Sequence, residues 1–194
     1  ATATVKAKTY TGKKLTSSSY TVKIKLNAKT TTLKKGTDYT VKAASRTSVG
    51  SSTVTITGKG NFKGTLKAKF AVTAKKISAT KVTVSSKVAY TGKTVKAKVI
   101  VKDGSKKLDS KSYKVSYKNN KKIGKATVTI TGKGNYAGTI KKTFKIVPAK
   151  ASIKTVKNSA KKTATVSFKA VKGAKSYKVS YRVKGAKKWT SVTT

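Results

Sequence analysis

The sequence contains no cysteine, histidine, methionine or glutamate, and its only acidic residues are Asp38, Asp103 and Asp109. Zinc, haem and iron–sulfur sites take their usual ligands from Cys, His and Met. Thiol and Ser-His-Asp catalysis need a Cys or a His, and the acid and base of a glycosidase would both have to come from three aspartates. We therefore expect no catalytic residues, no metal site, no cofactor and no enzymatic activity within these 194 residues.

Long apolar runs are also missing. No uninterrupted stretch approaches the roughly 20 apolar residues that a membrane helix requires, so we expect no membrane span. The first ten residues, ATATVKAKTY, lack an apolar signal segment, which indicates a mature protein or a fragment. Hydrophobic residues still make up 36% of the chain. Because they arrive in short alternating runs, we expect the chain to fold rather than to remain disordered.

Positive charge dominates what is present. Lys and Arg total 48, the only arginines are Arg46 and Arg182, and the formal net charge is +45. Like charges in this number destabilise a compact state by self-repulsion, so we expect anionic surroundings, high salt or a polyanionic partner. Arginine forks suit bidentate recognition of phosphates and guanine edges, whereas lysines act as hydrated point charges. The excess of lysine therefore predicts diffuse attraction to a charged polymer rather than sequence-specific nucleic-acid binding.

An internal repeat organises most of the chain. The segment YTGK at positions 10–13 returns at 90–93, and TVTITGKGNFKGT at 53–65 returns as TVTITGKGNYAGT at 127–139. A shorter segment, TDYTV at 37–41, returns as KSYKV at 111–115. The offset between copies falls along the chain, so the first copy holds extra residues. We place this insertion near 26–33 and predict a loop there.

Apolar residues alternate with lysine or threonine in each copy, which is the pattern of half-buried strands. The inward-facing positions that we predict are Tyr20, Val22, Ile24, Leu26, Val54, Ile56, Leu66, Ala68, Phe70 and Val72, then Ala97, Val99, Val101, Val128, Ile130, Ile140, Phe144 and Ile146. The GKGN segments join two of these strands, and their glycines permit the positive φ of a tight connection. A phosphate-binding loop would need a following helix, so we interpret the segments as turns. We predict that Phe62 and Tyr136, which follow the Asn of each turn, close the end of the core.

The recurring landmarks resemble the tandem immunoglobulin-like repeats of bacterial surface proteins from Gram-positive anaerobes, over residues 9–147. The resemblance implies an all-β array of immunoglobulin-like β-sandwich modules in a rod. We predict one module over residues 1–75 and a second over 76–147. The segment 148–194 is similar to the first half of a fibronectin type III module, since Tyr177, Val179, Tyr181 and Val183 alternate after a turn at Gly173. A complete sandwich of that kind needs about 100 residues, so this segment is either truncated or completed by strands of another chain, which would allow self-assembly.

The resemblance places the protein outside the cell or on a bacterial cell surface. We expect a cationic structural or adhesive module that binds anionic polysaccharide, teichoic acid or host glycans. One alternative is the noncatalytic accessory region of a secreted cell-wall hydrolase or protease. Another is a filament subunit or a nonspecific binder of nucleic acid such as matrix DNA. The predicted polyanion-contact residues are Lys23, Lys25, Lys98, Lys102, Lys178, Arg182 and Lys184.

Asp38 has two interpretations. Some surface domains of this kind resemble the chain and join a lysine to an Asn or Asp through an isopeptide bond that a buried acid promotes, and Asp38 is the only acid of its module. The second copy has Ser112 at the matching place. We favour an aspartate that bonds its local backbone in a turn, and the presence of an isopeptide bond stays open.

Overall fold

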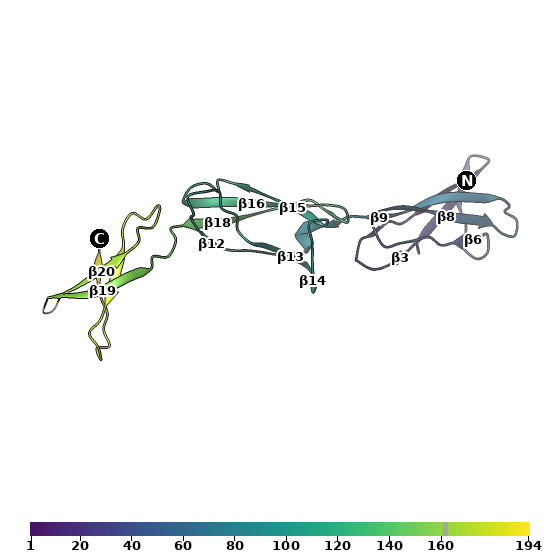
Figure 1. The fold of residues 1–194 in the computed structure, drawn as a ribbon. Helices are drawn as coiled ribbons and strands as arrows, with labels where there is room; N and C mark the ends of the chain where they lie inside the picture. The colour runs from purple at the N-terminus through teal and green to yellow at the C-terminus, as the bar shows by residue number, and fades with distance from the viewer. Residues whose placement is uncertain (161–162) are drawn as a thin grey trace. The chain divides into compact units, whose positions relative to one another are not determined.

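The computed structural model describes residues 1–160 and 163–194. The predicted third module, 148–194, includes positions 161 and 162, which lie outside the described residues. The described part of the chain consists of strands, turns and one short 3₁₀ helix, η1 (Ile77–Ala79), and contains no α-helix (Figure 1). The predicted all-β fold class is therefore confirmed, because alternating patterns give strands wherever one face is buried and the other solvated.

The first repeat forms three small sheets. The strands are β1 (Thr2–Val5), β2 (Lys8–Thr9), β3 (Leu15–Thr16), β4 (Tyr20–Leu26), β5 (Lys29–Thr32), β6 (Tyr39–Lys42), β7 (Ser45–Arg46), β8 (Gly50–Gly58) and β9 (Thr65–Thr73). Their orders are β1-β4-β5, β2-β9-β8-β6 and β3-β7. Strands β2 and β9 are parallel, whereas the other strand pairs of this repeat are antiparallel. The three-stranded and four-stranded sheets form two layers that face one core.

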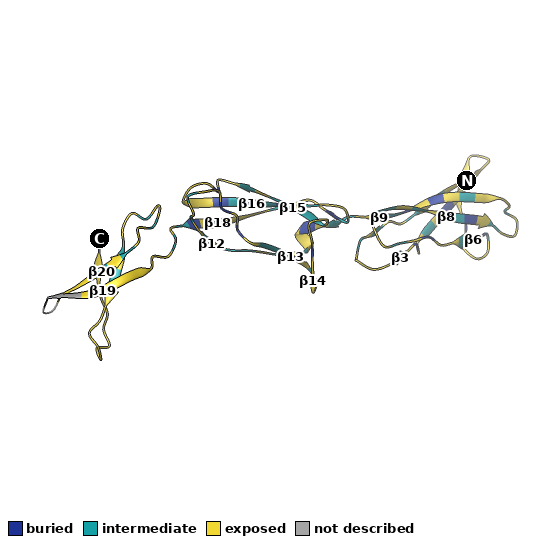
Figure 2. Ribbon diagram, in the orientation of Figure 1, coloured by how far each residue is buried: buried dark blue, intermediate teal, exposed yellow. Residues whose placement is uncertain are grey.

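The core of the first repeat lies between these sheets (Figure 2). Val54 and Phe70 are completely buried, and Val22, Ile56 and Val72 are nearly so. The predicted inward positions on β8 and β9 are thus confirmed. Burying large side chains such as these contributes about 1.5–3 kcal/mol each, which is how a chain with so much like charge can remain compact.

The insertion near residues 26–33 is not a loop, as we predicted, but the end of a longer hairpin. Strand β5 pairs with β4 from Lys23 opposite Thr32 to Leu26 opposite Lys29. Asn27 and Ala28 both have positive φ, which is the backbone of a two-residue turn that matches strand twist. Leu26 sits beside this turn and is 62% exposed, so its predicted inward position is wrong. The end of the hairpin extends beyond the core, so Leu26 is left open to solvent.

The second repeat forms a similar set of strands. After β10 (Lys75–Lys76), at the end of the first repeat, they are β11 (Lys81–Val84), β12 (Lys87–Ala89), β13 (Val99–Asp103), β14 (Lys106–Lys107), β15 (Tyr113–Lys118), β16 (Gly124–Gly132), β17 (Tyr136–Ala137) and β18 (Thr139–Val147). The orders are β11-β13-β14, β12-β18-β16-β15 and β10-β17. Val101, Val128 and Ile130 are fully buried, and Phe144 is only 2% exposed. Ala97 is buried but precedes β13, so its burial was predicted correctly and its place in a strand was not.

The segment after Pro148 forms two separate hairpins. These are β19 (Ile153–Ala160) with β20 (Thr163–Phe168), and β21 (Lys178–Tyr181) with β22 (Thr190–Thr193). Apolar side chains remain open to solvent here: Val183 is 74% exposed and Trp189 57%. A hollow of about 410 Å³ lies between Phe168, Tyr177 and their neighbours. We predicted a strand with alternating residues from Tyr177 to Val183, and only β21 within this segment forms a strand.

The chain divides into two compact units. The first contains Ala1–Lys81, Val101–Val115 and Ile130–Ile140, and the second contains Val82–Ile100, Ser116–Thr129 and Lys141–Thr194. The first unit therefore joins the whole first repeat to one end of the second repeat. That end carries hairpin β13–β14 and the Gly-rich turn 132–138.

Candidate functional site

The predicted polyanion-contact residues are all exposed, but they lie in different settings. Lys23 and Lys25 are on β4, Lys102 on β13 and Lys178 on β21, whereas Lys98, Arg182 and Lys184 lie outside strands. Lys23, Lys25 and Lys102 belong to the first compact unit and the other four to the second. The Arg182 guanidinium lies 5.1 Å from the centre of the Trp189 ring, so one of its faces is engaged.

The sheet register places lysine opposite threonine. Lys42 on β6 faces Thr55 on β8, and Thr55 faces Lys67 on β9. On the same outer face Thr53 lies opposite Lys69. The other sheet of this repeat repeats the arrangement, with Lys23 between Thr2 and Thr32 and Lys25 opposite Thr30. Mixed rows of ammonium and hydroxyl groups result, and we call them the lysine–threonine faces.

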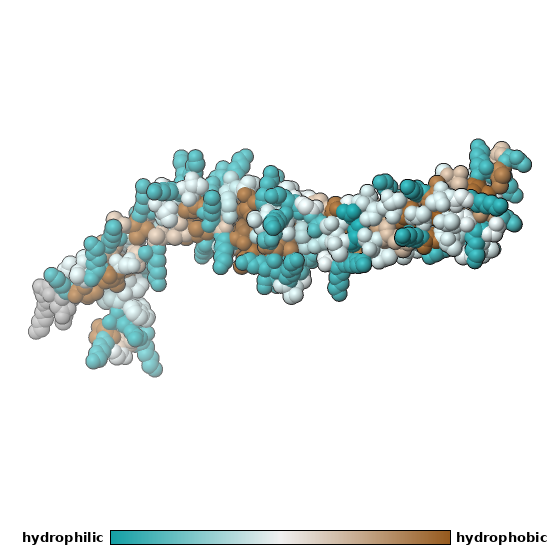
Figure 3. Space-filling model, turned by 45° about the vertical axis from the view of Figure 1, so that its right-hand side comes forward, coloured by the Kyte–Doolittle hydropathy of each residue, from teal (hydrophilic) through white to brown (hydrophobic). Residues whose placement is uncertain are grey.

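This register reduces the electrostatic repulsion between lysines of neighbouring strands. Like charges directly opposite one another on adjacent strands are destabilising. With a threonine strand between them, Lys42 and Lys67 are about 10 Å apart across two strand spacings, close to the screening length at physiological salt. Direct lysine pairs do occur, Lys102 opposite Lys107, beside Asp103 opposite Lys106, and Lys87 opposite Lys145 on the parallel pair β12 and β18. Figure 3 shows the hydrophilic side chains distributed over the visible surface rather than gathered in one patch.

Two of the three acids stabilise loops and do not neutralise lysines. Asp38 Oδ2 accepts the Lys34 N–H at 2.7 Å, so the local turn that we favoured for Asp38 is confirmed. Asp109 Oδ1 accepts the Lys111 N–H at 3.0 Å and the Ser112 hydroxyl at 3.2 Å. Slight desolvation acts to raise the pKa of Asp109, but these hydrogen bonds outweigh it and the pKa is lowered.

The two loops that precede the Tyr-x-Val strands therefore use different acids for the same purpose. Ser112 stands at the place of Asp38, and the carboxylate has moved three residues back, to Asp109. In both loops the backbone carbonyl at this place accepts the N–H of a Gly-rich turn: Lys59 donates to Asp38 O at 2.9 Å, and Lys133 to Ser112 O at 2.8 Å. The loop conformation is shared although the side chain that holds it is not.

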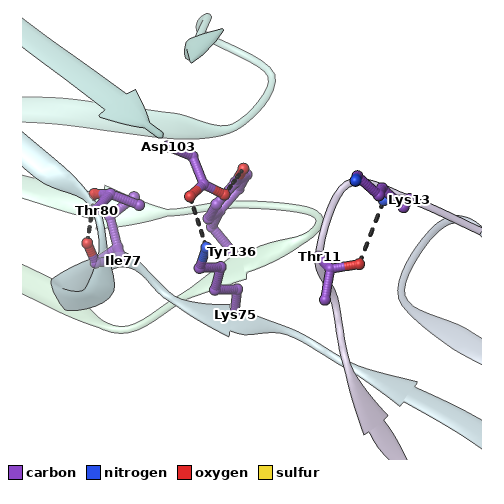
Figure 4. A network of polar contacts seen from close by, with 7 residues as sticks. All are labelled: Thr11, Lys13, Lys75, Ile77, Thr80, Asp103 and Tyr136. Atoms are coloured by element: carbon purple, nitrogen blue, oxygen red, sulfur yellow. Dashed lines mark hydrogen bonds and ion pairs between the residues drawn. The ribbon is translucent and has the colours of Figure 1, made fainter. Parts of the chain in front are cut away.

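The third acid forms the only ion pair among residues 1–160 and 163–194. The Lys75 ammonium donates to Asp103 Oδ1 at 2.6 Å, and the Tyr136 hydroxyl donates to Asp103 Oδ2 at 2.9 Å (Figure 4). The hydrogen bond from Lys75 lowers the pKa of Asp103, outweighing its partial burial. Burial, followed by the hydrogen bond to Asp103, raises the pKa of Tyr136. Both oxygens of Asp103 are thereby occupied.

Further contacts join the first repeat to the same end of the second. The Tyr10 ring meets the Tyr136 ring edge-on, with 5.6 Å between centroids. The Lys75 N–H donates to Asn135 O at 3.0 Å, and the Val49 N–H donates to Asn135 Oδ1 at 2.8 Å. We call Tyr10, Val49, Lys75, Asp103, Asn135 and Tyr136 the joint.

Arg46 fixes the bend that presents Val49 to the joint. Its guanidinium donates to the carbonyls of Ser51, at 2.7 Å, and of Ser48 and Val49, both at 3.2 Å. A planar fork with five donors can reach several acceptors at once, which a lysine cannot. The matching residue of the second repeat is Asn120, buried and bonded from Nδ2 to Val95 O at 2.6 Å.

The Gly-rich turns contribute through close backbone approach. Gly60, Gly64, Gly134 and Gly138 have the positive φ that we predicted, whereas Gly58 and Gly132 do not. A Cβ on Gly132 would lie 2.8 Å from the backbone of Tyr136 and Ala137. Tyr136 is therefore held by its own turn as well as by the joint. Tyr136 is buried where it contacts Tyr10 and Asp103, and Phe62, which we predicted to close the end of the core, packs half-buried against the core of the first repeat.

Within the described ranges, no group of three or more His, Cys, Asp or Glu side chains could hold a metal ion. A search of the same residues found no helix with the length and hydropathy needed to span a membrane. Comparisons of the chain with protein-family models, with curated proteins and with solved structures found no match. The described residues present exposed ammonium and hydroxyl groups on the lysine–threonine faces, and the joint between the two repeats.

Sequence reasoning identified exposed lysines but missed the joint. Lys75 is one of 46 lysines, and nothing near it in sequence distinguishes it. One signal was present: Asp103 is one of only three acids in the chain and lies close to Lys102, Lys106 and Lys107. An isolated acid in such a chain is expected to attract a cation into a fixed position.

Proposed function

We propose that this chain is a non-enzymatic, strongly cationic structural module that binds anionic polymers through the lysine–threonine faces. The observation that carries the proposal is the state of the acids: one is paired with Lys75, and two bond loop backbone. No other lysine side chain of the described residues forms an ion pair with a carboxylate. The field of these lysines extends over several sheets, which favours a long flexible polyanion over a small ligand.

Placement at a bacterial cell surface rests on the resemblance of residues 9–147 to tandem immunoglobulin-like repeats. The all-β fold is consistent with that resemblance, and the order of modules 1–75, 76–147 and 148–194 is part of the proposal. In this setting the joint would set the spacing of the modules and the lysines would hold wall polymer, teichoic acid or host glycan. The accessory-region and nucleic-acid alternatives have no separate observation in their favour.

The test is binding to poly(glycerol phosphate), to a sulfated glycan and to double-stranded DNA at several salt concentrations. Diffuse electrostatic binding predicts that log K falls linearly with log salt for each polymer, by counterion release. Affinities that do not change with ionic strength would contradict the proposal. The relative affinities at one salt concentration then rank wall polymer, glycan and DNA.

Charge reversal tests whether the binding is diffuse. The double variant Lys23→Glu/Lys25→Glu changes β4, and Lys67→Glu/Lys69→Glu makes the same change in charge on β9, the other sheet of the repeat. All four side chains are exposed, so both variants should fold. We expect similar reductions in affinity, about tenfold at low salt. A loss confined to one pair would contradict diffuse binding and assign a defined face.

A further inference from the structure

The Gly-rich turn occurs twice with the same internal geometry, but only one of the two is covered. Gly58 N–H bonds Gly64 O at 2.9 Å, and Gly132 N–H bonds Gly138 O at 2.9 Å. Inside the turns, Phe62 N–H bonds Lys59 O at 3.2 Å, as Tyr136 N–H bonds Lys133 O at 3.1 Å. Asn61 and Phe62 thus stand where Asn135 and Tyr136 stand in the joint.

The two surroundings differ. Tyr136 is 6% exposed beneath Tyr10 and Lys75. Phe62 is half-buried and Asn61 is exposed, and beside Phe62 lies an open hollow of about 280 Å³ lined by Ile24, Tyr39, Leu66 and others. Exposed apolar hollows often mark interaction sites, and this one lies beside a turn whose equivalent is covered in the joint.

We propose that this end of the first repeat is a docking surface for the exit end of another repeat of the same type. The exit end consists of the residues that follow the last strand, as Lys75 follows β9, of the Tyr-Thr-Gly-Lys turn and of the bend at Val49. In the joint this occupant supplies one backbone N–H to the Asn carbonyl, another to the Asn side chain, and the edge of a tyrosine ring. Asn61 and Phe62 offer the same acceptors and an aromatic ring.

The charge of the residues around the hollow determines which exit end can dock there. Leu33 N–H bonds Val22 O, and Leu108 N–H bonds Val101 O, so Ile24 occupies the place of Asp103 two residues further along. Asp38 is the only carboxylate that lines the hollow, and it already accepts the Lys34 N–H. A lysine at the exit would be desolvated there without its partner, which is unfavourable. The occupant therefore carries an apolar residue where the exit of the first repeat carries Lys75.

An extended chain tests the proposal. A second copy of residues 1–79 is placed directly before Ala1, because Lys6 N–H to Ser19 O and Ser85 N–H to Lys98 O match at an offset of 79. One version keeps Lys75 in the added copy and another carries Lys75→Leu there. In a control, Gly and Ser replace residues 74–77 of the added copy. The measurement is amide hydrogen exchange by NMR at residue 75 of the added copy.

With the leucine exit we expect this amide to exchange at least about tenfold more slowly than the amide at the same position of the Gly/Ser control. Phe62→Ala in the recipient repeat should abolish the protection, while the native Lys75 amide, bonded to Asn135, stays protected as an internal standard. If Phe62→Ala unfolds its repeat, which the Val54 amide reports, Phe62→Leu removes the ring and keeps the packing. Equally fast exchange in the leucine-exit and control chains would overturn the docking surface. Protection with the lysine exit alone would overturn the apolar specificity.

Discussion

The Lys75 ammonium lies 2.6 Å from Asp103 Oδ1, and these two residues come from different copies of the sequence repeat. Lys75 follows the last strand of the first copy, and Asp103 ends β13 in the second. Tyr136 occupies the other oxygen of the carboxylate. A chain with 46 lysines thus places one of its three acids where it holds two copies together.

Replacing Asp103 with Asn should loosen the joint. The change removes the charge that strengthens the Lys75 and Tyr136 hydrogen bonds and replaces one acceptor oxygen with an amide donor, so we expect the free energy of unfolding of the first compact unit to fall by about 1–2 kcal/mol. Thermal and denaturant unfolding measure the loss. Asp109→Asn is the matched control because it changes the net charge equally at an exposed turn. An equal loss in both variants would mean that total charge, not the joint, sets the effect.

Acid should weaken the joint in a defined range of pH. Because the pKa of Asp103 is lowered in the folded chain, its stabilising contribution is present above the unfolded value of about 4 and is lost as the pH falls through the lower folded value. Lys75, Lys106 and Tyr136 are the titratable groups that act on this carboxylate. The difference in unfolding free energy between wild type and Asp103→Asn should be constant from pH 7 to about 5 and shrink below about pH 4. A difference that grows on acidification would contradict this assignment.

Gly132→Ala should be destabilising because of close approach and not because of φ. The added methyl would lie 2.8 Å from backbone atoms of Tyr136 and Ala137, with no flexible side chain to move aside. We expect a cost of about 1–3 kcal/mol, the usual range for overpacking. Gly138→Ala provides the comparison, since Gly138 has φ +85° but open space around it, and should cost about 1 kcal/mol. Equal costs would show that the turn yields to the methyl group.

Arg46→Lys should be costly although it keeps the charge. A lysine cannot reach the carbonyls of Ser48, Val49 and Ser51 together, so at least one of these hydrogen bonds is lost, at about 1 kcal/mol. Hydrogen exchange at the Val49 amide, which bonds Asn135, should accelerate. Lys42→Arg makes the reverse exchange at an exposed strand position and should leave this amide unchanged. An unaltered Val49 amide in Arg46→Lys would separate Arg46 from the joint.

The strands were predictable from local pattern, and the exceptions have a physical cause. Val54, Ile56, Phe70 and Val72 alternate with polar residues and are buried, because a period of two puts them on one face of a strand. Leu26 follows the same period but is exposed. Alternation says which side of a strand a residue faces and not whether another layer lies over that side.

The candidate site was only half predictable. The exposure of lysines such as Lys23 and Lys25 follows from their place between apolar residues on one strand. Their opposition to Thr32 and Thr30 depends on the register of strand pairing, which the hairpin turn at Asn27 and Ala28 fixes. Tyr136 was identified as a landmark beside the Gly-rich turn, but its contact with Tyr10 joins residues far apart in sequence.

The sequence by itself determined that the chain is all-β, that its turns recur, and that its surface is overwhelmingly positive. These properties follow from local periodicity, from glycine at fixed places and from the near absence of acids, and none of them requires knowledge of neighbours in space. Only the tertiary structure decided which lysine pairs with an acid, which glycine is needed for close approach, and which of two equivalent turns is covered. Each of these depends on distances between residues of different strands or copies, which the order of residues along the chain does not contain.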